Sequence, residues 1–162
     1  MSERTDRLLT DGLTKGYASD NPPVEYLRYG FNLKANDYLS PEGGHYHDEW
    51  FADDNGGGQE IVRDGEELAT RVYAGGIIPI EELLKLCFTT KDVISRLIAS
   101  VRELGERTRL GNPCHLELSD GWEYSYEILK TSVEVPLTIG YESIRYNGRE
   151  VCAHGHMISP IR

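Results

Sequence analysis

The sequence lacks a long apolar run, and it holds only three cysteines, none of them in a Cys-x-x-Cys pair. A bilayer span needs about 20 apolar residues, so no membrane partner is predicted. The spacing of the cysteines fits neither a disulfide framework nor a zinc knuckle. We therefore expect free thiols that behave as small core residues at Cys87, Cys114 and Cys152. The N-terminus is polar and shows no secretory signal. These absences predict a soluble, cytoplasmic protein.

Basic residues are also scarce: 17 Lys and Arg stand against 27 Asp and Glu, for a net charge of −10. The excess lies in residues 1–82, which hold 17 acidic and 7 basic side chains. Such a surface repels a phosphate backbone, so no nucleic-acid partner is predicted. A solvated acidic face explains the charge most simply. The length, 162 residues, is that of a single domain over 1–162.

Three common catalytic motifs are missing. Gly56-Gly57-Gly58 has no Lys-Ser/Thr after it, so it is not a phosphate-binding loop. Gly75-Gly76 belongs to no G-x-G-x-x-G sequence, and no serine occupies a G-x-S-x-G elbow. The sequence therefore gives no support to a P-loop enzyme, a dinucleotide-binding enzyme or an α/β-hydrolase.

A helix is predicted over residues 90–107, where apolar residues recur at helical spacing. The stripe consists of Ile94, Leu97, Ile98, Val101 and Leu104. Thr89 and Asp92 have the spacing of a capping pair at its start. Shorter helices are expected over 80–87 and 4–13.

The remaining pattern predicts strands. Residues 122–128 alternate between large apolar and polar side chains, which is typical of a half-buried strand. Asp64-Gly65 and Asn147-Gly148 are each expected to form a tight hairpin turn with a positive φ at glycine. Near Glu142-Ser143 the apolar residues change from odd-numbered to even-numbered positions, which predicts a β-bulge.

The two hairpins suggest two similar halves, over about 25–80 and 113–160, joined by the helices of 80–107. The sequence therefore predicts an α+β fold with an antiparallel sheet of about 6–7 strands, built from both halves and packed on the central helix 90–107.

The same residues resemble a family. Tyr73-Ala74-Gly75-Gly76 and Tyr146-Asn147-Gly148 are similar to the hairpins of an uncharacterised microbial domain family, of the form G-Q/E-E-x-I-x-Y-x-G-K/R-x-V and ending near Y-x-G-G. Its members occur alone or behind a helix-turn-helix segment in regulators. The resemblance covers residues 25–158 and implies a sensing or interaction module. His154-Gly155-His156 departs from it, because the family tends to have Tyr and paired Gly there.

Histidine placement is the most specific signal for chemistry. Four of the five histidines form two His-x-His pairs, and alternate residues of a strand share a face. Imidazole together with carboxylate suits zinc, iron or manganese. The candidate metal ligands are His45, His47, Glu49, His154 and His156. A cupin barrel is a rival interpretation of Gly43-Gly44 and the first pair, but its further ligands are missing from the sequence.

The candidate ligand-binding residues are Arg71, Tyr73, Glu123 and Glu127, expected on the same sheet face as the histidines and opposite the helix. The alternative for all these residues is a solvated face. We therefore expect a non-enzymatic binding or regulatory domain for a small molecule or a protein, with no cofactor. The alternative is a metal-dependent enzyme that uses the histidine rows and a divalent metal. A homo-oligomer is compatible with either function.

Overall fold

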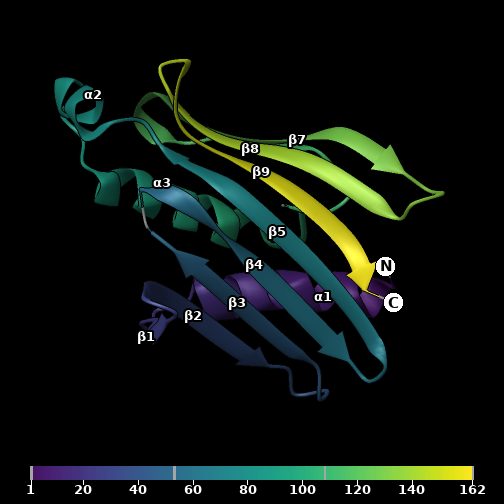
Figure 1. Cartoon of the computed structure of the whole chain (residues 1–162). Coiled ribbons are helices and arrows are strands. Elements are labelled where there is room, and N and C mark those ends of the chain that lie inside the picture. The colour runs from purple at the N-terminus through teal and green to yellow at the C-terminus, as the bar shows by residue number, and fades with distance from the viewer. Residues whose placement is uncertain (1, 53, 108, 162) are drawn as a thin grey trace.

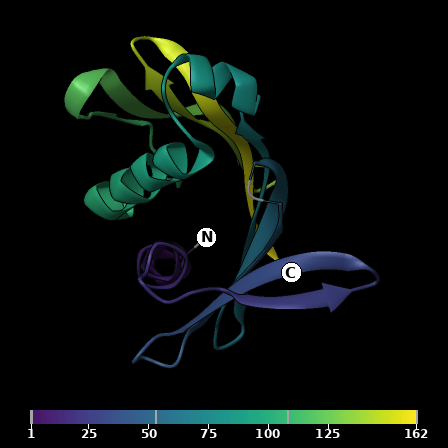
Figure 2. The same ribbon diagram turned by 90° about the vertical axis from the view of Figure 1, so that its left-hand side faces the viewer.

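The computed structural model describes residues 2–52, 54–107 and 109–161, which form one curved antiparallel sheet with helices on its concave face (Figures 1 and 2). The strands are β1 (Val24–Arg28), β2 (Phe31–Leu39), β3 (His45–Phe51), β4 (Asn55–Asp64), β5 (Glu67–Ile77), β6 (Cys114–Glu117), β7 (Trp122–Ser132), β8 (Leu137–Tyr146) and β9 (Arg149–Ile161). The α+β class and the antiparallel sheet are as predicted. The predicted number of strands is too low, because the described residues form a sheet of nine strands.

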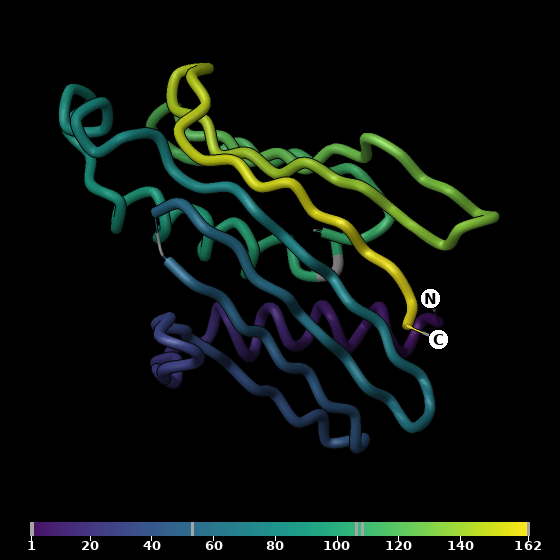
Figure 3. Tube along the Cα trace, viewed as in Figure 1, coloured from purple at the N-terminus to yellow at the C-terminus, as the bar shows by residue number. Residues whose placement is uncertain are grey.

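The helices are α1 (Glu3–Gly12), the π-helix η1 (Leu13–Tyr17), α2 (Ile80–Lys85), α3 (Thr90–Leu104), and the 3₁₀ turns η2 (Gly105–Arg107) and η3 (Ser119–Gly121). The three helices expected from the sequence are thus present. Figure 3 shows α1 and α3 running behind the strands as two separate rods, so α3 shares the concave face with α1.

The strand order is β1-β2-β3-β4-β5-β9-β8-β7-β6. The chain therefore forms a meander on either side of the central β5–β9 pair, where Tyr73 lies opposite His156 and Gly75 opposite His154. Each meander follows a long helix, α1 in the first half and α3 in the second. A duplication of the sequence remains a prediction.

Both glycines of the predicted hairpins lie in tight turns with a positive φ. Asn147 and Gly148 have φ values of 47° and 76°, as a type I′ turn requires. In the first hairpin Asp64 pairs with Glu67, so the loop is Gly65-Glu66, one residue later than predicted. Gly65, at φ 60°, holds the first loop position.

The predicted bulge is misplaced. The register shifts between Ile128 and Lys130 and again between Ile144 and Arg145, rather than at Glu142-Ser143. Glu142 and Ile144 share one face of β8, because they pair in register with Tyr126 and Tyr124. The apparent change of parity arises because a charged residue, Glu142, faces the core.

Two apolar clusters hold the helices on the sheet. Leu97, Val101 and Leu104 of α3 are buried with Trp122 and Ile144 of the second meander. The Thr89–Asp92 capping box is present, as expected. Leu8 and Leu9 of α1 pack with Tyr46 and Val62. Gly12 allows this contact, because a Cβ atom there would lie 2.0 Å from the Tyr46 ring.

Among the helices of the described residues, none is both long and apolar enough to cross a membrane.

Candidate functional site

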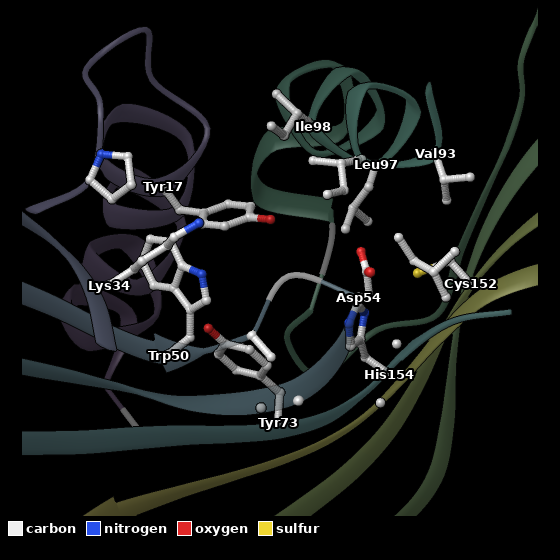
Figure 4. A pocket seen from close by; sticks show the side chains of 18 of the residues that line it. Tyr17, Lys34, Trp50, Asp54, Tyr73, Val93, Leu97, Ile98, Cys152 and His154 are labelled. Atoms are coloured by element: carbon white, nitrogen blue, oxygen red, sulfur yellow. The ribbon is translucent and has the colours of Figure 1, made fainter. Parts of the chain in front are cut away.

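A cavity of about 360 Å³ lies between the concave face of the sheet and the helices α3 and η1. Its lining includes Tyr17, Trp50, Tyr73, Leu97, Arg109 and His154. Figure 4 shows Tyr17 and Trp50 on one side, the apolar side chains of α3 on another, and Tyr73 and His154 rising from the strands. The volume is within the usual range of small-molecule sites.

The π-helix η1 brings Tyr17 to this cavity. The wide turn is closed by the Ala18 amide, which donates to the carbonyl of Leu13 at 2.8 Å. π-helical turns are rare and occur frequently at functional sites. The Tyr17 ring meets the Trp50 ring edge-on, with 5.7 Å between centroids. Burial raises the pKa of Tyr17 to about 12, so its hydroxyl stays neutral.

Tyr73 makes the first polar contact beneath the cavity. Its hydroxyl donates a hydrogen bond to Oδ1 of Asp48 at 3.0 Å. Burial, and next the nearby charge of Glu60, raise the pKa of Asp48 to about 8. The Asp48 carboxyl group is therefore largely protonated at neutral pH, and burial also raises the pKa of Tyr73.

Glu142 is the centre of a second buried cluster. Nε and Nη2 of Arg109 donate to its two carboxylate oxygens at 2.7 and 2.8 Å, and the Tyr124 hydroxyl donates to Oε1 at 2.7 Å. Nδ1 of His154 and Nε2 of His156 lie 3.2 and 3.6 Å from Oε2. Burial alone would raise the pKa of Glu142, but the Arg109 charge and the histidine contacts hold that pKa well below its usual value.

A second arginine–glutamate pair lies beside the first. Arg71 forms an ion pair with Glu60, and both side chains are almost fully buried. Nη1 of Arg71 also donates to the main-chain carbonyl of Arg109 at 2.8 Å. Burial raises the pKa of Glu60 and lowers that of His156 to about 4, so His156 is neutral at pH 7. The two arginines thus link the loop after α3 to the sheet.

The structure divides the sequence-predicted site between the two faces of the sheet. Arg71, Tyr73, His154 and His156 lie on the concave face, as their contacts with Glu60, Asp48 and Glu142 show. The expectation that these four face away from the helix is wrong. In β9 the two histidines share parity with Cys152 and Ile158, which are both buried core residues.

The other predicted site residues point to the convex face. They are His45, His47, Glu49, Glu123 and Glu127, each of which alternates with buried residues of β3 or β7. Nε2 of His45 and Nδ1 of His47 both lie near Oδ1 of Asp37, at 2.9 and 3.0 Å. Glu49 accepts a hydrogen bond from Arg28 at 2.9 Å. The two His-x-His pairs therefore lie on opposite faces of the sheet and do not meet in this structure.

The sequence patterns do not identify the other residues that line the cavity, nor the buried polar residues beneath it, which form its floor. The missed residues are Tyr17, Asp48, Trp50, Glu60, Arg109 and Glu142. One signal was available, because Asp48 and Trp50 alternate in phase with Tyr46 in the same strand. Charged residues in such positions are ordinarily expected to be exposed, whereas Asp48 is only 1% exposed.

The cysteines also differ from expectation in part. All three are free thiols, but Cys87 is exposed and only Cys152 is fully buried. Cys152 lines the cavity, and burial raises the pKa of its thiol to about 12. It is therefore a poor nucleophile, since a thiol reacts as its thiolate.

Within the described ranges, no three His, Cys, Asp or Glu side chains are placed to hold one metal ion. Comparison of the chain with protein-family models, curated proteins and solved structures finds no match. The resemblance to the uncharacterised family thus remains a prediction, and the candidate function rests on the geometry of the cavity.

Proposed function

We propose that this protein binds a small molecule, without chemical conversion, in the cavity between the sheet and helices α3 and η1. The observation that carries the proposal is a cavity of about 360 Å³ with aromatic walls, in which Tyr73, Arg109 and His154 line the space and buried polar partners lie directly behind them. Small-molecule sites are concave and mostly apolar, with a few convergent polar groups.

The buried floor is the feature that a purely structural core does not need. Replacing a buried ion pair by apolar residues is often neutral or stabilising. Here two such pairs, Arg109–Glu142 and Arg71–Glu60, lie side by side next to the Asp48–Tyr73 hydrogen bond. Perturbed titratable groups that gather at a cavity are typical of a functional site.

The small molecule is favoured over a protein partner because the polar groups converge inside the fold rather than on its outer surface. The metal-dependent enzyme is not favoured. Both oxygens of Glu142 already accept hydrogen bonds from Arg109, and the two His-x-His pairs lie on opposite faces of the sheet.

A variant that fills the cavity tests the proposal. Ile94 lines the cavity from α3 and is only half-buried, so Ile94→Trp should place an indole in that space. Lys91→Trp, on an exposed position of the same helix, is the matched control. We expect neutral aromatic fragments to give saturation-transfer NMR signals with the wild type and with Lys91→Trp, and to lose them with Ile94→Trp. Equal signals from all three proteins would contradict binding in the cavity.

A further inference from the structure

The walls of the cavity select for a flat ring. Tyr17 and Trp50 form one wall at an interplanar angle of 78°. Leu97 and Ile98 of α3 form the facing wall, and Tyr73 closes the space from the sheet (Figure 4). Edge and face contacts with such aromatic side chains, together with aliphatic contacts, favour a planar aromatic occupant.

The polar atoms at the sheet end of the cavity are hydrogen-bond acceptors. Nδ1 of His154 faces the Glu142 carboxylate, which only accepts hydrogen bonds, so Nδ1 carries the hydrogen. When Nδ1 of an uncharged imidazole carries the hydrogen, Nε2 is an acceptor. The Tyr73 hydroxyl donates its hydrogen to Asp48, which leaves its oxygen lone pairs for another donor. The rings of Tyr73 and His154 lie 6.2 Å apart between centroids, so one small molecule can reach both.

The buried charges beneath the cavity are paired, and Lys34 and Asp54 add one charge of each sign to its lining (Figure 4). The Arg109 guanidinium is held by both oxygens of Glu142, and Arg71 is paired with Glu60. An anionic ligand group would have to give up its water at this floor, where both arginines are already paired, which is costly. The floor therefore favours a neutral polar group over an anionic one.

Resting on the proposed function, we propose that the occupant is a neutral, planar aromatic molecule whose ring N–H or phenolic O–H donates to one of the two acceptors, His154 or Tyr73. An indole-like or phenol-like molecule has this chemistry.

Two pairs of probes separate the parts of this proposal. Indole and benzofuran have the same shape, but only indole carries an N–H donor. Indole-5-carboxamide and indole-5-carboxylate differ mainly in charge. NMR titrations of the full chain should give a Kd for indole about three to ten times lower than that for benzofuran, the worth of one hydrogen bond. The carboxamide should likewise bind more tightly than the carboxylate.

Variants of the two acceptors complete the test. Tyr73→Phe and His154→Leu are made separately, and the one that removes the acceptor should reduce the preference for indole over benzofuran to less than about twofold. A preference kept by both variants would overturn this inference. If benzofuran binds the wild type as tightly as indole does, and neither binds Ile94→Trp, this inference is overturned and the proposed function stands. Absence of binding by all four probes would contradict both.

Discussion

The side chain of Tyr73 reaches across a neighbouring strand to hydrogen-bond Asp48 at 3.0 Å, although β4 lies between β5 and β3. The contact is possible because the residue paired with Tyr73 in β4 is Gly58. A Cβ atom on Gly58 would lie 2.5 Å from the Tyr73 hydroxyl oxygen and 2.5 Å from the carbonyl oxygen of Glu49. Gly58 therefore provides the room in which the Tyr73 side chain lies.

Gly58→Ala should accordingly displace Tyr73 and lower the free energy of unfolding by about 1–3 kcal/mol, the usual cost of overpacking. Gly111→Ala is the matched control, because a Cβ atom on Gly111 would meet open space and should change stability by less than about 0.5 kcal/mol. Urea denaturation of both variants checks the difference. Equal midpoints would show that Gly58 does not set the position of Tyr73.

The raised pKa of Asp48 predicts that the free energy of unfolding depends on pH. Its pKa is about 8 in the folded protein against an ordinary value of 3.8, so its favourable contribution is complete below the unfolded pKa and is lost as pH rises through 8. His156 acts oppositely: its pKa is about 4 when folded, so its contribution is complete above 6.5 and is lost as pH falls towards 4. The range from pH 6.5 to 8 therefore excludes His156, and an Asp48 variant separates Asp48 from Glu60, whose pKa is also raised.

In that range we expect the free energy of unfolding to fall by up to about 1.4 kcal/mol per pH unit in the wild type, the slope for one proton. Asp48→Asn, which cannot ionise, should show a distinctly flatter profile between pH 6.5 and 8. Denaturation curves at several pH values measure both slopes. Parallel profiles for the two proteins would mean that Asp48 is ionised in the folded state.

The Arg109–Glu142 pair should be sensitive to loss of one partner. Glu142→Gln keeps the size of the side chain but leaves a buried guanidinium without its carboxylate, at a cost of about 3–5 kcal/mol. Glu82→Gln removes the partner of Arg149 in an exposed ion pair and should leave the denaturation midpoint close to that of the wild type. A small effect of Glu142→Gln would indicate that water reaches Arg109.

The three thiols should differ in reactivity. In the native protein a disulfide reagent such as dithionitrobenzoate should modify exposed Cys87 first, and buried Cys152 only after unfolding. The denatured, unreduced protein should then give three thiols per chain. Rapid modification of Cys152 in the folded protein would show that the cavity opens widely.

Much of the fold follows from patterns that depend on neighbours in the sequence. The helical stripe of 90–107, the Thr89–Asp92 cap and the Asn147-Gly148 turn are all local and are confirmed. The edge strand β1 escapes prediction because it is exposed along almost its whole length and so has no alternation of polar and apolar residues. Its existence depends on pairing with β2, which is not visible in its own composition.

The candidate site is harder to predict because it depends on which face of each strand the helices cover. The sequence identifies His154 and Tyr73 but favours the solvent side for both, since ionisable residues are seldom fully buried. In β9 the alternation is masked by adjacent Val151 and Cys152, which are both buried around the register shift. The partners that allow His154 and Arg71 to be buried, Glu142 and Glu60, come from other strands and have no spacing signature.

The most direct test of small-molecule binding uses the two tryptophans of the chain. Trp50 lines the cavity, whereas Trp122 is buried in the core under Phe88. In ¹H–¹⁵N spectra of the full-length protein titrated with indole, binding in the cavity should move the Nε1–H signal of Trp50 in a saturable way and leave that of Trp122 in place. Movement of both signals equally, or of neither at saturating indole, would contradict the proposed site.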